Sequence, residues 1–469
     1  MLGLILVWLL FILVSNIGIA DPDIWWHLRN ASDIIRSGHF IHTDTWTFTV
    51  GGKPWIDFEW LGEMPWYFAY RWLGDRGLYL LMMLLGGSIV AGIYWLALMR
   101  SRGTLSAFAC GVVGLLFAMV SMAPRTLLFG WLFLVIELGI LWSFSRGRDF
   151  TAWLPLLFLV WINTHGSWFI GFAMMNAYFA CGWLDGEWGT LYATRWTPQQ
   201  ARKVLAVAGA TFAVLFVNPY GWRLVVYPLD VIFRQKGTMQ YIAEWASLDF
   251  HTVRGKTILA TLFVFSLLQL VRRRRWSVQD VLFVLLAIYG AVSYVRFVFL
   301  AGIVIPPLLA IDLSAGRPRQ RRAENEKPGF YAVMGCVVVV LMAMKVPSSA
   351  KLHAGIAETY PEKAVPYVRS LAGRGNVLNN FNWGAYFEWQ APEVKEFLDP
   401  RVDIFVHEGV MADYVKAVRV QDTFAVLDKY QIRYVVMPPD DPISYLLAHS
   451  AGWKVGYRDG QAVGFERVH

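Results

Sequence analysis

The chain has 469 residues, of which 57% are hydrophobic and only 16% charged, with a mean hydropathy of +0.44. Soluble domains carry about 25% charged residues, so this composition excludes a protein that is soluble throughout. The formal net charge is +8, but the basic residues stand between apolar runs, which indicates membrane topology and not nucleic-acid binding. The three cysteines, Cys110, Cys181 and Cys336, lie in apolar segments without metal-ligand spacing, so neither a disulfide framework nor a zinc site is expected.

About eleven apolar segments are candidates to cross a bilayer, which takes roughly 20 mostly apolar residues. They are residues 2–20, 78–99, 104–123, 126–145, 152–165, 167–183, 204–218, 257–271, 278–295, 297–313 and 329–346. The first segment lacks a basic start and exceeds the apolar part of a secretory signal, so we interpret it as an uncleaved membrane helix. The sequence therefore predicts an α-helical polytopic membrane protein.

Short basic clusters fall in alternate loops between these segments. They are Arg100 and Arg102, Arg146 and Arg148, Arg195 with Arg202 and Lys203, Arg272 to Arg275, and Arg317 with Arg319, Arg321 and Arg322. A cytoplasmic N-terminus places every cluster inside, as the positive-inside rule requires. On this orientation two long loops, 21–77 and 219–256, and everything after about Pro347 lie outside. The first loop contains two expected interfacial helices, one with Ile24, Leu28, Ala31 and Ile35 on one face, the other at 60–73.

Residues 347–469 have a mixed composition and form a predicted extracytoplasmic α/β domain, separate from the transmembrane domain 1–346. Expected strands are 377–378, 385–389, 434–437 and 462–467, and expected helices are 423–430 and 443–448. Arg458-Asp459-Gly460-Gln461 suits a hairpin turn before the last strand.

Polar residues gather at the outer ends of the expected spans. They are Asp21 and Asp23, Arg125, Asn163 and His165, Glu244, and Arg296. Ionisable groups at membrane depth cost about 2.5–3.5 kcal/mol each and tend to line cavities. We therefore expect a polar cavity that faces the exterior.

Each of these residues also has a plainer interpretation. Asp21 and Asp23 suit the cap and first turn of a helix, and with His27 they form only a weak candidate for a metal site. Arg125 and Arg296 are either snorkelling residues or ligands of a phosphate. His165 can be a packed side chain, Glu244 a surface acid, and Trp25-Trp26 an interfacial anchor.

The first outside loop resembles those of polytopic bacterial proteins related to the GT-C glycosyltransferase superfamily. The resemblance is carried by Asp21-Pro22-Asp23-Ile24-Trp25-Trp26-His27-Leu28, by 44–49, by Gly52 to Leu61 including Asp57 and Glu59, by Trp161 to Gly166, by 218–221, by Glu244-Trp245, and by 382–386 and 397–401. It implies a GT-C-like fold and a catalytic acid in this loop, Asp21 or Asp23. It also makes Trp25, Trp26, His27, Asp57 and Glu59 candidate substrate-binding residues.

The leading hypothesis is a glycosyltransferase of the bacterial cytoplasmic membrane that uses a polyprenyl-phosphate-linked sugar at the outer face, with a glycan, lipid or protein as acceptor. Asp21 or Asp23 is the expected base, and Arg125 or Arg296 neutralises the leaving phosphate. No cofactor is required, although a divalent cation is compatible. Two alternatives stay open. One is a non-catalytic envelope scaffold. The other is a lipid or saccharide transporter, which would carry polar groups through the midplane, where Glu137 stands nearly alone.

Overall fold

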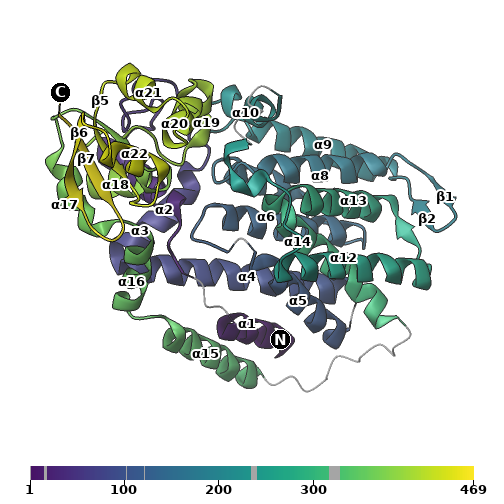
Figure 1. Ribbon diagram of the computed structural model, residues 1–469. Coiled ribbons are helices and arrows are strands. Elements are labelled where there is room, and N and C mark those ends of the chain that lie inside the picture. The colour runs from purple at the N-terminus through teal and green to yellow at the C-terminus, as the bar shows by residue number, and fades with distance from the viewer. Residues whose placement is uncertain are drawn as a thin grey trace. The chain divides into compact units, whose positions relative to one another are not determined.

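A computed structural model describes residues 2–14, 18–101, 103–120, 122–233, 240–315 and 328–468. The chain divides into two compact units (Figure 1). Unit 1 comprises Met1–Ile17, Tyr79–Val225 and Ala243–Val346, and unit 2 comprises Gly18–Leu78, Val226–Ile242 and Pro347–His469. The segment 21–77, expected as the first outside loop, thus belongs to the same compact unit as the C-terminal residues. The expected boundary between 1–346 and 347–469, which concerns topology, stays a prediction.

Unit 1 is a bundle of apolar helices. They are α1 (Leu2–Val14), most of α4 (Asp75–Ser101), α5 (Thr104–Ala118), α6 (Leu127–Phe144), η1 and α7 (Thr151–Trp153, Leu154–Ile162), α8 (Trp168–Cys181), α9 (Pro198–Val214), α12 (Val253–Arg272), α13 (Val278–Ser293), η3 and α14 (Val295–Phe297, Val298–Ser314) and α15 (Pro328–Lys345). The central α14 packs against α5 and α13. Every expected span overlaps one of these helices, although residues 15–17 of the first span lie outside the described residues. The predicted fold class, an α-helical polytopic membrane protein, is confirmed.

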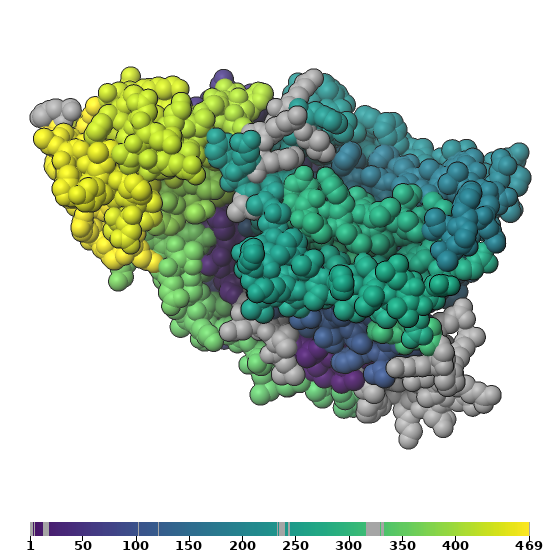
Figure 2. Space-filling view, turned by 45° about the vertical axis from the view of Figure 1, so that its right-hand side comes forward, coloured from purple at the N-terminus to yellow at the C-terminus, as the bar shows by residue number. Residues whose placement is uncertain are grey.

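The helices differ in their ability to cross a bilayer alone. Four described helices are long and apolar enough, namely Asp75–Ser101, Leu127–Phe144, Val253–Arg272 and Val295–Ser314, and Val333–Lys345 with Ser349–Thr359 forms a pair bent by 53°. Four others are apolar but shorter. On α12, Phe263 and Leu270 are 69% and 76% exposed, and Figure 2 shows this helix on the viewed face. Such an apolar exposed face suits contact with lipid. The number of crossings stays a prediction.

Two ion pairs join helix ends in unit 1. Arg100 Nη2 lies 2.5 Å from Asp280 Oδ2, and Arg274 Nη1 lies 3.3 Å from Asp312 Oδ1. Asp280 belongs to α13 and Asp312 to α14, whereas Arg100 belongs to α4 and Arg274 follows the end of α12. These two members of the basic clusters therefore hold helices together, besides any effect on topology.

A small sheet in unit 1 escaped the sequence prediction. β1 (Gly186–Trp188) pairs antiparallel with β2 (Leu191–Ala193), and β2 pairs parallel with β3 (Trp276–Ser277). Strands of two or three residues carry too little periodicity to be predicted.

The C-terminal part of unit 2 is an α/β fold around a four-stranded sheet of order β4-β5-β7-β6. Its strands are β4 (Asn376–Asn379), β5 (Ile432–Met437), β6 (Trp453–Arg458) and β7 (Val463–Arg467). β4 and β5 are parallel, and β7 is antiparallel to both β5 and β6. The helices are α16 (Ser349–Thr359), η4 (Glu362–Ala364), α17 (Val365–Ser370), η5 (Phe381–Trp383), α18 (Gly384–Gln390), α19 (Val402–His407), α20 (Val410–Val418), α21 (Thr423–Lys429) and α22 (Pro442–Ala448).

The structure corrects one predicted strand of this domain. Residues 385–389, expected as a strand, belong to helix α18. Aromatic side chains favour strands in general, but a short apolar run does not distinguish a strand from a buried helix. The other expected strands and helices are observed, and the turn at 459–462 joins β6 to β7, as the bond from Asp459 N to Ala462 O (2.9 Å) indicates.

Helices α2 (Pro22–Ser37) and α3 (Trp60–Leu73) begin and end within the first loop. α2 contacts α3 and α18. Three residues of the expected apolar face of α2, Ile24, Leu28 and Ala31, are buried at 0% exposure, whereas the fourth, Ile35, is 40% exposed. The buried apolar side chains of α2 thus pack against other parts of unit 2. The amphipathic pattern alone had predicted contact with the membrane surface.

Backbone and buried charges join the first loop to the C-terminal fold within unit 2. The N–H of Phe48 donates to the carbonyl of Glu396 at 3.1 Å, and the Thr49 hydroxyl donates to the carbonyl of Phe397 at 2.5 Å. Arg401 Nη2 lies 2.5 Å from Asp44 Oδ1 and 2.6 Å from Asp399 Oδ2. These contacts explain why the two segments form one compact unit.

The second outside loop also reaches this fold through α10 (Trp222–Phe233). The Tyr227 hydroxyl donates to Asp403 Oδ2 at 2.7 Å, and its ring packs on Phe58. Unit 2 therefore collects its residues from three separate parts of the chain.

Glu396 is fully buried, and neither carboxylate oxygen has a hydrogen-bond partner. Burial raises the pKa of Glu396 well above its ordinary value, and Asp399 adds to this effect. In the folded protein Glu396 therefore keeps a proton at pH values where Glu396 of the unfolded chain has lost it. The contribution of this proton to stability is present at low pH, and it is lost as the pH rises through the pKa of Glu396 in the folded protein.

We expect Glu396→Gln to raise the thermal midpoint at pH 8 and to change it little at pH 4, because Gln keeps the shape without an ionisable group. Each unit by which the pKa is raised corresponds to about 1.4 kcal/mol at high pH. Differential scanning calorimetry at both pH values measures the difference, with the exposed Glu358→Gln as matched control. An equal response of the two variants would contradict the assignment.

Candidate functional site

In unit 1, two predicted site residues, Arg125 and Arg296, contact the dipeptide Glu244-Trp245, whose glutamate is a third. This dipeptide belongs to η2 (Ala243–Trp245), and Glu244 Oε1 forms an ion pair with Arg125 Nη1. The guanidinium carbon of Arg296 lies 5.6 Å from the centre of the Trp245 ring, in a cation–π contact. The structure therefore brings Arg125, Glu244 and Arg296 together from three separate segments. We call these residues and Trp245 the arginine cluster.

Short-range contacts hold the arginine cluster in place. The N–H of Val295 donates to the carbonyl of Ala246 at 3.0 Å, which joins η3 to η2. Trp245 packs edge-on against Tyr294 and Phe297, each at 5.5 Å between ring centres. The side chains of Arg125 and Glu244 are 21% and 26% exposed. The described contacts thus place two guanidinium groups and one carboxylate at Trp245, with the ion pair of Arg125 and Glu244 partly solvated.

Asn163 and His165 occupy the turn between α7 and α8. The Asn163 amide donates to the carbonyls of Leu159 and Val217 at 2.9 and 3.0 Å. The backbone N–H of Ser167 donates to His165 Nδ1 at 3.0 Å, so a neutral ring carries its proton on Nε2. Both side chains are at most 5% exposed. His165 therefore has the packed, hydrogen-bonded surroundings of its plainer interpretation. A role of Asn163 and His165 in substrate binding stays a prediction.

In unit 2, the two candidate bases open helix α2 in different roles. Asp21 is the N-cap, and its Oδ1 accepts the backbone N–H of Asp23 at 3.0 Å. Pro22 follows in the first turn, where its missing N–H has no effect. Asp21 is 5% exposed, whereas Asp23 is partly exposed in the first turn. The capping interpretation therefore holds for Asp21 and leaves Asp23 the more accessible carboxylate.

A buried polar network lies between α2 and α3 in unit 2. The Asn30 amide nitrogen lies 2.6 Å from Asp57 Oδ2 and 2.6 Å from Glu63 Oε2. His27 Nδ1 is 2.9 Å from Glu63 Oε1, and His27 Nε2 is 3.5 Å from Glu59 Oε2. The structure thus brings together the candidates His27, Asp57 and Glu59, with every member at most 6% exposed.

Burial controls the protonation of this network. It raises the pKa of Asp57 to about 6, against the hydrogen bonds from Glu59 and Asn30, which lower it. Burial also raises the pKa of Glu63 well above its ordinary value, and the neighbouring Asp57 adds to that effect. Three carboxyl groups in one buried volume cannot all ionise without strong repulsion. The network therefore favours protonated carboxyl groups more than the unfolded chain does, and its hydrogen bonds brace α2 against α3.

Sequence reasoning missed Asn30 and Glu63. The signal was present as spacing, because His27 and Asn30 stand three residues apart on one face of α2, and Glu59 and Glu63 stand four apart at the start of α3. Such spacing indicates a buried polar contact only when it is known that these two helices pack against each other.

Trp25 and Trp26 are core residues of unit 2. Trp25 is 1% exposed and packs against Tyr70, Tyr360 and Tyr386 at 6.4, 5.8 and 5.2 Å between ring centres. Trp26 is 8% exposed and its ring lies 3.8 Å from that of His27. Neither ring is available as an exposed stacking platform or an anchor at a membrane surface. Among the described residues, moreover, no three His, Cys, Asp or Glu side chains form a metal-binding group. His27 Nδ1 lies 2.9 Å from Glu63 Oε1, and a metal site of His27 with Asp21 and Asp23 stays a prediction.

Comparison with known proteins gives structural matches only. No protein-family model and no curated protein sequence matches the chain. The oligosaccharyltransferase of Archaeoglobus fulgidus, tethered with an acceptor peptide containing the NVT sequon, matches over 100% of this chain and 74% of that chain, with a TM-score of 0.55 and 13% identity. This chain has the GT-C fold.

Two further structures agree with this assignment. The oligosaccharyltransferase AglB from Archaeoglobus fulgidus, in complex with an inhibitory peptide and a dolichol-phosphate, matches over 93% of this chain and 69% of that chain, with a TM-score of 0.55 and 11% identity. The apo form of the same organism's enzyme matches with a TM-score of 0.54 and 11% identity. At such identities the similarity establishes the GT-C fold and not the reaction. The first-loop motif, which no family model matches, stays a prediction.

The chemistry available to this GT-C chain differs between its two units. In unit 1 the arginine cluster suits an anion, because planar guanidinium groups bind phosphate oxygens in pairs. In unit 2 Asp23 is a carboxylate in the first turn of α2. Further along the same helix, His27 and Asn30 contact Glu63 and Asp57 in the buried network. A carboxylate in that position can accept a proton from a hydroxyl or amide nucleophile.

Proposed function

We propose that this protein is a membrane glycosyltransferase that transfers a sugar from a polyprenyl-phosphate-linked donor to an acceptor at the outer face of the bacterial cytoplasmic membrane. The observation that carries the proposal is the arginine cluster, a cationic site within a GT-C fold. The matched AglB structure contains a dolichol-phosphate and a peptide. A lipid-linked phosphate and a glycan, lipid or protein acceptor are the corresponding partners proposed for this chain.

In the proposed reaction, an acceptor heteroatom attacks the anomeric carbon of the sugar while the bond from that carbon to the phosphate oxygen breaks. The bonding electrons leave with the polyprenyl phosphate, and the acceptor proton passes to a carboxylate. Arg125 and Arg296 stabilise the charge that grows on the leaving phosphate. Asp23 is the proposed base, and Asp21 positions it as the N-cap. His27, Asp57 and Glu59 act as positioning residues for α2.

We expect Arg125→Ala and Arg296→Ala each to lower the rate of sugar transfer by about 10²–10³-fold. Arg125→Lys is expected to lose less, because it keeps the charge but not the planar fork. The assay presents purified full-length protein, in detergent and with or without chelator, with a panel of polyprenyl-phosphate sugars. Arg195→Ala, an exposed arginine of unit 1, is the matched control. Transfer at the wild-type rate by both alanine variants would contradict the role of the cluster.

The same assay distinguishes the non-catalytic scaffold from the enzyme. A scaffold that kept the fold would bind a lipid-linked sugar weakly or not at all and would show no turnover with any donor or acceptor. A transporter would move the labelled lipid or sugar across a liposome membrane without breaking the glycosyl bond. Release of polyprenyl phosphate in step with acceptor glycosylation is expected only of the proposed enzyme.

A further inference from the structure

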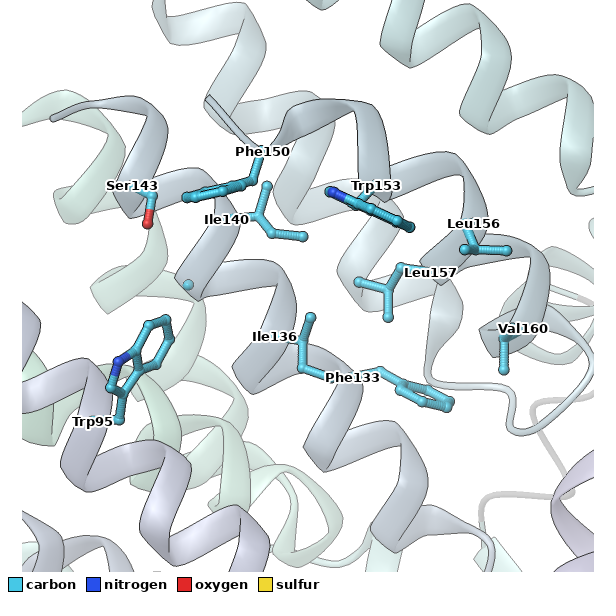
Figure 3. Close-up of a pocket in the computed structure, with 11 residues that line it drawn as sticks. Trp95, Phe133, Ile136, Ile140, Ser143, Phe150, Trp153, Leu156, Leu157 and Val160 are labelled. Carbon is cyan, nitrogen blue, oxygen red and sulfur yellow. The ribbon is translucent and has the colours of Figure 1, made fainter. Parts of the chain in front are cut away.

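An apolar groove lies within unit 1, between α6, the η1–α7 segment and α4. It has a cavity volume of about 560 Å³, within the range of pockets that hold small ligands. Its walls include Trp95, Phe133, Ile136, Phe150, Trp153 and Leu156. Figure 3 shows Phe133, Ile136 and Ile140 along α6 facing Trp153, Leu156 and Leu157, with Ser143 at one end. Apart from Ser143, every lining residue that carries a polar side-chain atom is a tryptophan.

The two main walls of the groove are helices of different lengths. The η1–α7 segment, Thr151–Ile162, is an apolar helix shorter than a full span. At 1.5 Å per residue it extends about 18 Å, against a hydrocarbon core of about 30 Å. The adjoining α6 has 18 residues and is therefore about 27 Å long. The groove lies along the length that the two helices share, where Phe133 to Ser143 of α6 stand beside Phe150 to Val160. Ile136 on this stretch of α6 is 41% exposed.

Gly139 shapes the third wall. A Cβ atom at Gly139 would lie 2.6 Å from Cζ3 of Trp95, closer than side chains can approach. The absence of a side chain therefore lets the Trp95 ring lie against α6. The Trp95 ring is 46% exposed and Trp153 is 61% exposed, so two indole rings stand at the groove without a covering protein segment among the described residues.

Positive charge stands at one end of the groove. The exposed loop 145–150 joins α6 to η1, so it connects Ser143 and Phe150, which line that end. The loop carries Arg146 and Arg148, and its Asp149 is paired with Lys203. Arg146 Nη2 donates to the carbonyl of Arg100 at 3.1 Å, which holds its guanidinium at the end of α4. An apolar channel that ends in arginines matches an amphiphile with an apolar chain and an anionic head.

We propose that this groove binds one acyl chain of an anionic phospholipid, whose phosphate lies against the Arg146–Arg148 loop. The apolar wall from Phe133 to Ser143 covers eleven residues of α6, and ten rises of 1.5 Å give it a length of about 15 Å. That length is half of a hydrocarbon core of about 30 Å, which is the depth of one leaflet and of one acyl chain. A polyprenyl chain is much longer than this wall. The proposal does not depend on the proposed enzymatic function.

The test uses full-length protein in detergent, incubated with phosphatidylglycerol or with phosphatidylcholine of the same chains. Native mass spectrometry counts the bound lipids, and thermal unfolding measures the stabilisation. We expect phosphatidylglycerol to be retained about fivefold more than phosphatidylcholine, as one basic residue near a headgroup would give. Arg148→Ala is expected to remove most of this preference, while Arg195→Ala, on an exposed arginine elsewhere, keeps it.

A second pair of variants tests the groove itself. Leu156→Trp fills it, and Leu205→Trp makes the same change on α9, where Leu205 is 60% exposed. Only Leu156→Trp is expected to lose the retained phosphatidylglycerol. Equal retention of both lipids by the wild-type protein, or equal loss in the two tryptophan variants, would overturn the proposal. Displacement of phosphatidylglycerol by an equimolar polyprenyl phosphate would also overturn it and assign the groove to an isoprenoid chain.

Discussion

Asp23→Asn is expected to keep the fold and to lower sugar transfer by about 10²–10⁴-fold, because an amide cannot accept the acceptor proton. The two acids at the start of α2 are separable by their contacts. Asp21 caps the helix, and Asn caps a helix about as well as Asp. Asp21→Asn should therefore preserve the cap and show how much its charge matters, whereas Asp23→Asn removes the proposed base without touching the cap.

The kinetic signature distinguishes a base from a residue that only holds the site. Loss of the base should lower kcat and leave the KM for the lipid donor nearly unchanged, because the donor phosphate is assigned to the arginine cluster. Asp440→Asn, at an exposed position of unit 2, serves as the control. Wild-type rates in both Asp21→Asn and Asp23→Asn would show that the base is elsewhere. A loss in Asp21→Asn alone would transfer the role to Asp21.

The transmembrane fold was predictable because hydropathy is a local property of the chain. Segments such as 126–145 and 297–313 contain enough apolar residues to indicate a membrane helix without knowledge of their neighbours. The helix at 384–390 was not predictable from the sequence. Its residues Ala385, Tyr386, Phe387 and Trp389 suit either a strand or a buried helix. Its packing against α2, distant in the sequence, decides between them. Length and local pattern alone do not contain that information.

The candidate site was predictable in part for the same reason. The capping role of Asp21 follows from its neighbours in the sequence, and the structure shows that cap. The burial of Trp25 was not predictable, because its partners Tyr360 and Tyr386 belong to the C-terminal fold. The pairing of Asp44 with Arg401 spans 357 residues. Interactions at such separations depend on the whole fold and leave no periodic signal.

Arg401→Met is expected to lower the free energy of unfolding of unit 2 by about 3–5 kcal/mol, since it leaves buried carboxylates without their cation. The Arg401 side chain is 2% exposed, and those of Asp44 and Asp399 are 0% exposed. Burial opposes the charge of Arg401, yet Asp399 and Asp44 raise its pKa above the usual range. The guanidinium carbon also lies 4.2 and 4.6 Å from the ring centres of Trp46 and Trp55, so Arg401→Lys should restore only part of the loss.

Tryptic cleavage after the exposed Lys53 reports opening of the first loop within unit 2, and Arg419→Met, at an exposed position, is the control. Equal cleavage of the Arg401→Met and Arg419→Met proteins would contradict the prediction. Adding Asp44→Asn and Asp399→Asn to Arg401→Met separates two causes of the loss. If uncompensated charge is responsible, neutralising the acids should recover most of the stability. If lost packing against the two indole rings is responsible, the triple variant should remain as unstable as Arg401→Met, because it does not restore the contacts with Trp46 and Trp55.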